Sequence, residues 1–224
     1  MFFPEIRTKE DIVRLIGEVG FLPYFRGEIP GFSIEESTRY MWGSDADPEG
    51  PWEWKGPILR ESGCAYGKFY RGRACYISRE WFPDFANWRR DGYDYDARVD
   101  DGLARHRDGR IMQVLTEHPS LLSRELKALS CIGEDSRKSF DGSLTYLQMQ
   151  GYITTVNFEY QMDAHGRTYG WGVARYTTPE NAFGPDFIER VYQCEPAESR
   201  ARMEAHLKKL LPQADAKQLA RFLG

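Results

Sequence analysis

The chain has 224 residues, of which 41% are hydrophobic and 14% are aromatic. This composition can bury a core and excludes a disordered chain, and the length allows one large domain or two small ones. The net charge of −4 argues against strong nonspecific binding to DNA, because phosphate contacts come from clustered Lys and Arg side chains.

The sequence predicts a cytoplasmic protein without a membrane partner. It contains no run of about eighteen apolar residues, and its opening residues, Met1 to Glu5, lack the basic and apolar regions of a secretory signal. The cysteines are scattered without a CxxC pair, which indicates reduced thiols rather than a zinc knuckle or a disulfide framework. They are Cys64, Cys75, Cys131 and Cys194.

The first segment, residues 1–104, predicts an aromatic-rich α/β subdomain. Thr8 and Asp11 have the spacing of a capping box, and apolar residues then recur at helical spacing until Gly20. Residues 23–57 are rich in Gly, Pro and acidic residues and favour loop. Further on, residues 65–70 and 73–77 alternate like strands around the turn residues Arg71 and Gly72, which predicts a β-hairpin.

The second segment, residues 105–178, predicts a winged helix, the helix-turn-helix fold with a β-hairpin wing. Asp108 can cap a first helix that Pro119 stops, a short strand follows at residues 121–122, and Ser123 can cap a second helix that carries Leu126 and Leu129. A third helix begins near Ser136, and strands at 152–160 and 168–177 then form the wing. Several apolar residues share the buried face of the helices: Ile111, Val114, Leu115, Leu126, Phe140, Leu144 and Leu147.

The third segment, residues 179–224, predicts a helical tail. Met203, Leu207, Leu210 and Leu211 form one apolar stripe, which indicates either internal packing or a homodimer interface. The fold class that we predict is therefore α+β, with the winged helix between an N-terminal subdomain and C-terminal helices. The winged-helix segment is the least acidic of the three, with 9 basic and 8 acidic side chains.

The outer face of the third predicted helix is the main candidate for binding DNA. Helical geometry places Lys138, Thr145 and Gln148 opposite the apolar face, together with Asp141. Lys can hold a phosphate, Thr can pack on a thymine methyl group, and Gln can read adenine through two hydrogen bonds, whereas the carboxylate of Asp141 opposes binding. An ordinary solvated helix face is the alternative.

Two other segments are candidates for nucleic-acid contact. In the predicted wing, His165 and Arg167 lie at the turn and could reach a minor groove or a phosphate, unless they serve only to keep the turn soluble. In the first segment, rings interleave with cations in an arrangement that can stack on unpaired bases, although the core of a small β-rich subdomain explains most of the rings more simply. The residues concerned are Trp54, Lys55, Trp88, Arg89, Arg90 and Tyr93.

The sequence predicts neither a metal nor a cofactor. The carboxylates between Asp91 and Asp101 lack the glycine and terminal glutamate of a calcium-binding loop, and a solvated acidic turn explains them better. The four histidines are isolated from one another, and no glycine-rich phosphate loop occurs.

Several runs of residues resemble a group of bacterial proteins described as AlkZ-related, and the likeness covers most of the chain. The resemblance implies kinship with winged-helix DNA glycosylases of the AlkZ, or YcaQ, type, which unhook alkylated crosslinks and use a Gln-x-Gln or Gln-x-Asp motif to position water. Gln148-Met149-Gln150 has the letters of that motif. The runs are Trp54 to Ile58, Tyr66 to Phe69, Phe82 to Phe85, Arg89 to Asp94 and Leu147 to Tyr152.

The resemblance thus implies catalytic roles for Gln148 and Gln150. Helical geometry points the other way, because the two side chains lie about 80° and about 280° around the helix from Phe140 and do not converge. Three hypotheses follow: a DNA-binding winged-helix protein linked to repair or regulation, a glycosylase that excises alkylated bases, and a noncatalytic protein-interaction module. DNA is the expected partner under the first two.

Overall fold

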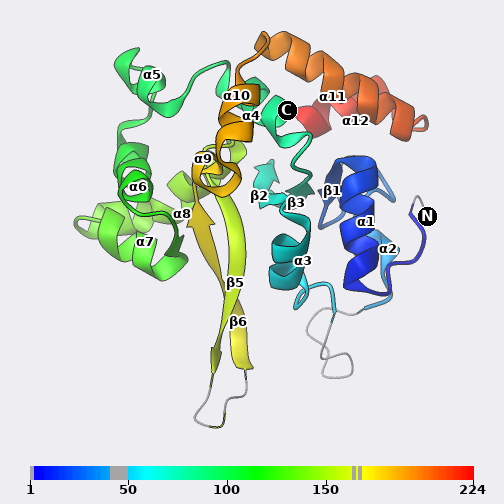
Figure 1. The fold of residues 1–224 in the computed structure, drawn as a ribbon, viewed down its shortest axis with the longest axis horizontal. Coiled ribbons are helices and arrows are strands. Elements are labelled where there is room, and N and C mark those ends of the chain that lie inside the picture. Colours follow the sequence, from blue (N-terminus) through cyan, green and yellow to red (C-terminus); the bar gives the residue numbers. More distant parts are fainter. Residues whose placement is uncertain (1–2, 41–49, 163–164, 166–167) are drawn as a thin grey trace.

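A six-stranded antiparallel sheet runs through the structure, in the order β1-β3-β2-β5-β6-β4 (Figure 1). The computed structural model describes residues 3–40, 50–162, 165 and 168–224, and for residues 161 and 168–171 it describes the backbone alone. The chain is thus a mixed α/β protein, which confirms this part of the predicted fold class. The strands are β1 (Phe21–Pro23), β2 (Ala65–Tyr70), β3 (Arg73–Ile77), β4 (Leu121–Leu122), β5 (Thr154–Met162) and β6 (Thr168–Thr177).

The elements with the clearest local signals form where the sequence predicts them. Helix α1 (Lys9–Val19) begins after Thr8, whose hydroxyl accepts the backbone N–H of Asp11 while the Asp11 carboxylate accepts that of Thr8. The hairpin of β2 and β3 turns at Arg71 and Gly72, which both have positive φ values, 52° and 75°. That conformation gives a two-residue turn whose twist matches the paired strands.

Four helices of the N-terminal half were not predicted: α2 (Ile34–Ser37), α3 (Lys55–Ser62), α4 (Phe82–Arg90) and α5 (Tyr95–Asp100). The first residues of these helices are of types that are also common in loops, so the sequence does not indicate where the helices begin. Pro57 and Pro83 lie in the first turns of α3 and α4, where a residue without an N–H is tolerated because that group has no partner within the helix. The loop expected at the end of the 23–57 segment is therefore wrong from Lys55 onward.

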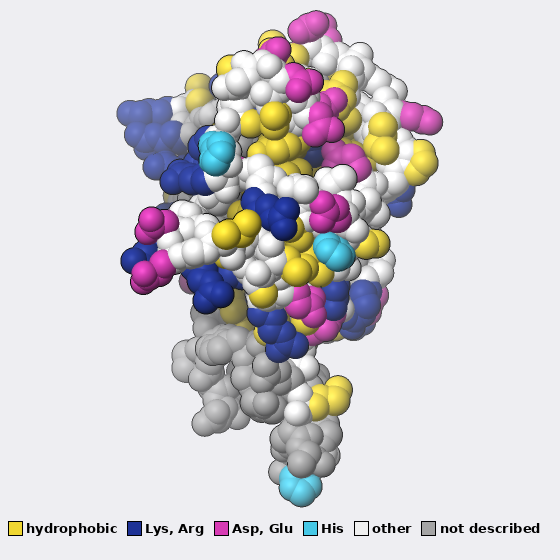
Figure 2. All heavy atoms as spheres, turned by 90° about the vertical axis from the view of Figure 1, so that its left-hand side faces the viewer, with side chains coloured by type: hydrophobic (Ala, Val, Ile, Leu, Met, Phe, Trp, Pro, Cys, Tyr) yellow, Lys and Arg dark blue, Asp and Glu magenta, His cyan; other side chains and the backbone are white. Residues whose placement is uncertain are grey.

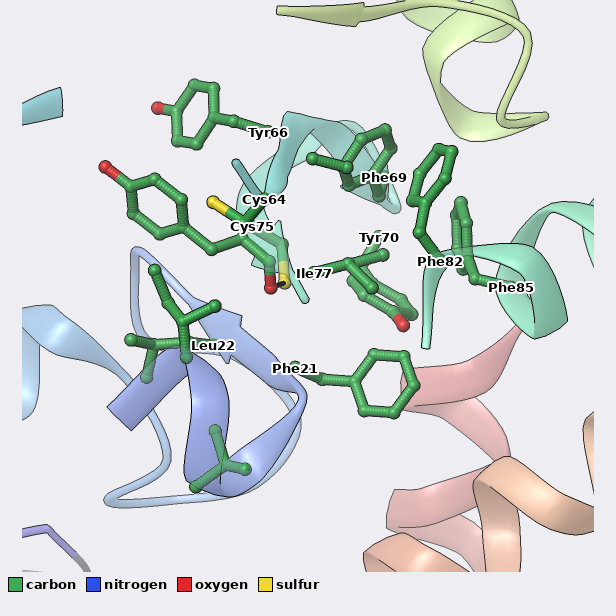
Figure 3. Close-up of a cluster of buried hydrophobic side chains, with 14 of the residues drawn as sticks. Phe21, Leu22, Cys64, Tyr66, Phe69, Tyr70, Cys75, Ile77, Phe82 and Phe85 are labelled. Carbon is green, nitrogen blue, oxygen red and sulfur yellow. Dashed lines mark hydrogen bonds between the residues drawn. The ribbon is translucent and has the colours of Figure 1, made fainter. Parts of the chain in front are cut away.

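The aromatic residues of the N-terminal half close into a core. Figure 3 shows Phe69, Tyr70, Phe82 and Phe85 side by side, drawn from the hairpin and from α4. Ring centroids lie 5.4 Å apart for Phe69 and Phe82 and 5.2 Å apart for Phe69 and Phe85. These tilted pairs are typical of aromatic packing in an interior. They make this segment a packed core and not an open cleft.

The sheet continues from the N-terminal segment into the middle segment. Tyr66 of β2 pairs with Thr155 of β5, and the hydroxyl of the adjacent Thr154 both accepts the N–H of Tyr66 and donates to its carbonyl oxygen, at 3.2 Å each. The buried Thr154 side chain thus takes a place in the ladder of hydrogen bonds. The segments before and after the predicted boundary at residue 104 therefore contribute strands to the same sheet.

Three helices form a second core beside the β5–β6 hairpin: α6 (His106–Glu117), α7 (Ser123–Ser130) and α8 (Glu134–Met149). All seven apolar residues that the sequence assigns to the shared face are buried there, which confirms this face. Three details are wrong. Ser123 does not cap α7, because it is the first residue of the helix and Leu122 occupies the N-cap position. Leu129 is 45% exposed. Asp108 does not cap α6, because the helix begins two residues earlier and the buried Asp108 carboxylate pairs with Arg105 at 2.7 Å.

The C-terminal segment is helical, as predicted, with α9 (Pro179–Phe183), α10 (Pro185–Val191), α11 (Pro196–Leu210) and α12 (Ala216–Leu223). The apolar stripe of α11 packs within the same chain, where Met203, Leu207 and Leu211 are buried in the first core. A homodimer would therefore need other residues. Among the helices of the described residues, none is long and apolar enough to cross a membrane.

Candidate functional site

The N-terminal half of α8 is the exposed part of the predicted recognition helix. Arg137 and Lys138 are both exposed on it, and Lys138 pairs with Glu134 at 3.2 Å, one turn earlier. On the neighbouring α7, Lys127 pairs with Asp141 of α8 at 3.4 Å. These exposed pairs screen the two lysines, so the face is of mixed charge and binds anions weakly.

Arg124 and Arg137 are the cations that sequence reasoning missed. Both are exposed, on α7 and α8, and neither makes an ion pair with another residue that the structure describes. Helical spacing was an available signal for Arg124 alone, which lies about 200° around α7 from the buried Leu126. Arg137 lies only about 60° around α8 from the buried Phe140, so its exposure could not be read from spacing. A guanidinium without a carboxylate partner can bind phosphate without first breaking a pair.

The C-terminal half of α8 packs on the protein itself, which contradicts the prediction for Gln148. The side chain of Gln148 is only 2% exposed. Its Oε1 accepts the backbone N–H of Lys68 at 3.0 Å, and its Nε2 donates to the carbonyl oxygen of Leu144 at 3.2 Å. Because both ends of the amide are used inside the chain, Gln148 is not on an open face that could read a base. Its role is to join α8 to the β2–β3 hairpin.

Thr145 lies in the same contact. It is half-buried, and its methyl carbon lies 3.6 Å from where a side chain on Gly72 would begin. This is an ordinary contact distance, so glycine at this turn position is favoured by its positive φ of 75° and not by a lack of space. The expectation that Thr145 faces a groove of DNA does not agree with this packing, and Lys138 alone of the three predicted contacts is exposed.

Gln150 lies just beyond the end of α8 and is half-buried. The neighbouring carbonyl oxygen, that of Met149, accepts a hydrogen bond from Nε of Arg89 at 2.9 Å. The amide of Gln148 points to Lys68 of β2. That Gln148 and Gln150 do not converge on one pocket stays a prediction.

The β5–β6 hairpin carries the predicted wing contacts. Arg175 of β6 donates to Glu159 of β5 at 2.6 Å, which ties the two strands together and neutralises both charges. His165 is exposed at the turn. Arg167 lies outside the described residues, so its predicted contact with DNA stays a prediction.

The predicted base-stacking rings pack on the protein. Trp54 makes an edge contact with Tyr40 at 5.3 Å, and Trp88 has the guanidinium of Arg200 over its ring at 5.1 Å. Both tryptophans adjoin the first core. The carbonyl oxygen of Tyr93 accepts hydrogen bonds from the hydroxyls of Tyr152 and Tyr192, and the guanidinium of Arg98 lies 5.7 Å from the Tyr93 ring centroid. These contacts support the core alternative for the rings.

The predicted backbone cations of this segment face inward. Lys55 is 3% exposed, and its ammonium lies 3.2 Å from the ring centroid of Trp52 and 4.3 Å from that of Phe158. Burial lowers the pKa of Lys55 to about 7, although Glu53 acts in the opposite direction. A buried amine of this kind cannot neutralise a phosphate in solvent, so the prediction for Lys55 is wrong.

The prediction that Arg90 contacts a nucleic-acid backbone is also wrong, because Arg90 is fully buried. Its guanidinium donates to Glu180 and to the hydroxyl of Tyr192 at 2.8 Å each, and to the carbonyl oxygen of Gly151 at 2.7 Å. It also stacks over Tyr152, 4.5 Å from the ring centroid. Arg90 therefore joins α4 to the end of α8 and to the C-terminal helices.

The described residues contain no group of three or more His, Cys, Asp or Glu side chains placed to hold a metal ion. Cys64 and Cys75 are fully buried, and burial raises the pKa of both thiols. Raised thiol pKa values keep these cysteines protonated and unreactive, which fits a packing role.

A family model described as AlkZ related matches residues 6–224. The chain belongs to the AlkZ-related family. The resemblance in the sequence is thereby confirmed. A comparison with curated proteins finds no match.

The AlkZ-related chain also resembles a solved structure, the DNA glycosylase AlkZ of Streptomyces sahachiroi, with a TM-score of 0.50 and 10% sequence identity. The match covers 98% of this chain and 60% of that one, so the chain spans about three fifths of the glycosylase. At this identity the likeness shows a shared fold and no more.

Proposed function

We propose that residues 105–178 form a winged-helix module with which the protein binds DNA, in a role connected with repair or regulation. The observation that carries this proposal is the chain order α6-β4-α7-α8-β5-β6, in which β4 pairs with β6 beside a core of three helices. Short strand, helix pair and β-hairpin in this order are typical of helix-turn-helix proteins with a wing. Membership of the AlkZ-related family supports the link to DNA.

The contact surface that we propose is the exposed face of α7 and of the first half of α8, with Arg124, Arg137 and Lys138, together with the hairpin that carries His165. The second half of α8 is excluded, since Gln148 is committed to the β2–β3 hairpin. A partial surface with few unpaired cations predicts modest affinity, dominated by phosphate contacts and steeply dependent on salt.

A titration of labelled duplex DNA at about 50 mM and about 200 mM salt tests the proposal. The double variant Arg124→Gln/Arg137→Gln should weaken binding and reduce the salt slope by about 2, since each phosphate contact contributes roughly 0.9. The matched control is Lys209→Gln/Lys217→Gln, which removes two exposed cations from α11 and α12. Equal losses in both variants, or no binding at the lower salt concentration, would refute the proposed surface.

Base excision is the second candidate, favoured by the fold that the chain shares with a DNA glycosylase. It requires that a base be flipped out of the duplex and that a polar group orient the attacking water. Of the two glutamines, Gln148 is held by hydrogen bonds within the chain, whereas Gln150 makes no side-chain hydrogen bond to another described residue. Incubation with alkylated duplex, followed by hot alkali, detects excised bases as strand breaks. Breaks that persist unchanged in Gln150→Ala would remove this role for Gln150.

A further inference from the structure

An open groove with a volume of about 770 Å³ lies between α5, α6 and the α9–α10 segment. Its floor includes Met112 of α6 and Val191 of α10, which are both buried, and the ring of Tyr152. The groove thus lies on the side of α6 that faces the C-terminal helices. It is separate from the face of α7 and α8 that we propose for DNA.

Exposed apolar side chains gather at this groove. The described residues include seven large hydrophobic side chains that are exposed, and three of them line it: Val99 at 49%, Ile188 at 55% and Tyr192 at 38%. Figure 2 shows hydrophobic side chains together with Asp and Glu in the upper half of this face. Scattered exposed apolar residues are normal in a protein, but a group around one depression is typical of a binding surface.

The charged side chains that line the groove are all acidic. Its lining includes the carboxylates of Asp94, Asp96 and Glu180 and no Lys, Arg or His. Neither Asp94 nor Asp96 makes an ion pair with another described residue. The segment 91–101 beside the groove carries five Asp and one Arg, a net charge of −4, which equals the net charge of the whole chain.

The buried Arg90 beneath the groove does not cancel this charge. Its guanidinium is enclosed and already bound to Glu180, whose side chain remains 38% exposed. Glu180 is therefore paired with Arg90. The carboxylates of Asp94, at the N-cap of α5, and Asp96, within α5, are exposed and make no ion pair with another described residue. Helix α5 has no fully buried residue and forms a wall of the groove, held to the second core through Tyr95, whose ring makes an edge contact with Tyr152 at 5.2 Å.

We infer that this groove binds a cationic amphipathic segment of a partner protein, with apolar residues against Val99, Ile188 and Tyr192 and Lys or Arg side chains along the rim formed by Asp94 and Asp96. Charge complementarity selects this occupant. DNA is repelled by three carboxylates with no cation among them. An apolar face of one helix fits a groove between helices, a common mode of peptide recognition.

The probe for this inference is a synthetic peptide of about three helical turns, with Leu on one face and Lys on its flanks. A matched peptide has Glu in place of Lys, and a third has Ser in place of Leu. Fluorescence anisotropy of the labelled peptides with the full chain should detect binding of the first peptide alone. If the third peptide, which keeps Lys but has Ser in place of Leu, bound as strongly as the first, the groove would be only a nonspecific acidic patch. That result would overturn the inference.

Two variants locate the binding. Asp94→Asn/Asp96→Asn should weaken it about 5-fold, since each exposed charge contact contributes modestly, and asparagine still caps α5. Ile188→Ser, at a 55% exposed position, should weaken it about 10-fold. The control Asp135→Asn/Glu198→Gln removes two exposed carboxylates elsewhere and should change nothing. Equal weakening by the control, or competition by duplex DNA for the peptide, would overturn the inference.

Discussion

Replacing Arg90 with methionine removes a fully buried guanidinium and keeps an unbranched side chain of similar length. The variant removes the donor from three acceptors, namely the buried carbonyl oxygen of Gly151 and the partly exposed Glu180 carboxylate and Tyr192 hydroxyl. Breaking a buried charged contact by removing one partner typically costs about 3–5 kcal/mol of stability. The loss of stacking over Tyr152 acts in the same direction.

Urea denaturation followed by tryptophan fluorescence measures this loss. With a slope of roughly 2–3 kcal/mol per molar, the midpoint should fall by about 1–2.5 M. The control is Arg79→Met, which removes an exposed pair with Asp186, whose two side chains are 53% and 72% exposed. Such a pair contributes roughly 0–1 kcal/mol. If Arg90→Met unfolds within about 1 kcal/mol of the unsubstituted protein, the guanidinium does not hold these elements together.

The remaining predictions concern Lys55 and the glutamine pair at the end of α8. Burial lowers the pKa of Lys55 to about 7 in the folded protein. Between about pH 10 and about pH 7, Lys55 is therefore protonated in the unfolded chain but neutral in the folded one. The free energy of unfolding should decline as the pH falls through that window. Lys55→Met should remove this decline, and the difference in free energy of unfolding between variant and parent should change by about 3–4 kcal/mol between about pH 10 and about pH 7, in favour of the variant. A gap independent of pH would contradict this reasoning. Gln148→Ala should destabilise the fold by about 1–3 kcal/mol by leaving the N–H of Lys68 unpaired, and Gln150→Ala by less than about 1 kcal/mol. A fully stable Gln148→Ala protein that has lost activity on DNA would instead place Gln148 in a site.

Local signals in the sequence were sufficient for some elements. Thr8 with Asp11 determines the start of α1, and Arg71 with Gly72 determines the hairpin turn, because in each case neighbouring residues satisfy the backbone groups themselves. The apolar face of α6 to α8 follows from helical spacing alone. The start of α4 could not be predicted, since Pro83 and the surrounding aromatics suit loops as well as a first turn.

The candidate site was predicted less well, because its exposure depends on contacts between distant parts of the chain. Helical geometry correctly places Gln148 away from Phe140, but the β2–β3 hairpin covers that side, and the contact joins residues 80 positions apart. The same holds for Arg90, whose acceptors at Gly151 and Glu180 lie far along the sequence. A pattern of charge and spacing cannot tell a solvated cation from one enclosed by tertiary structure.

The central claim is that DNA meets the exposed face of α7 and the first half of α8. Amide hydrogen exchange of the full chain with and without duplex DNA at low salt tests it most directly. The account predicts added protection in α7 and between Glu134 and Asp141, with little change along the acidic groove. Protection confined to the groove, or no protection anywhere under conditions where binding is measured, would contradict it.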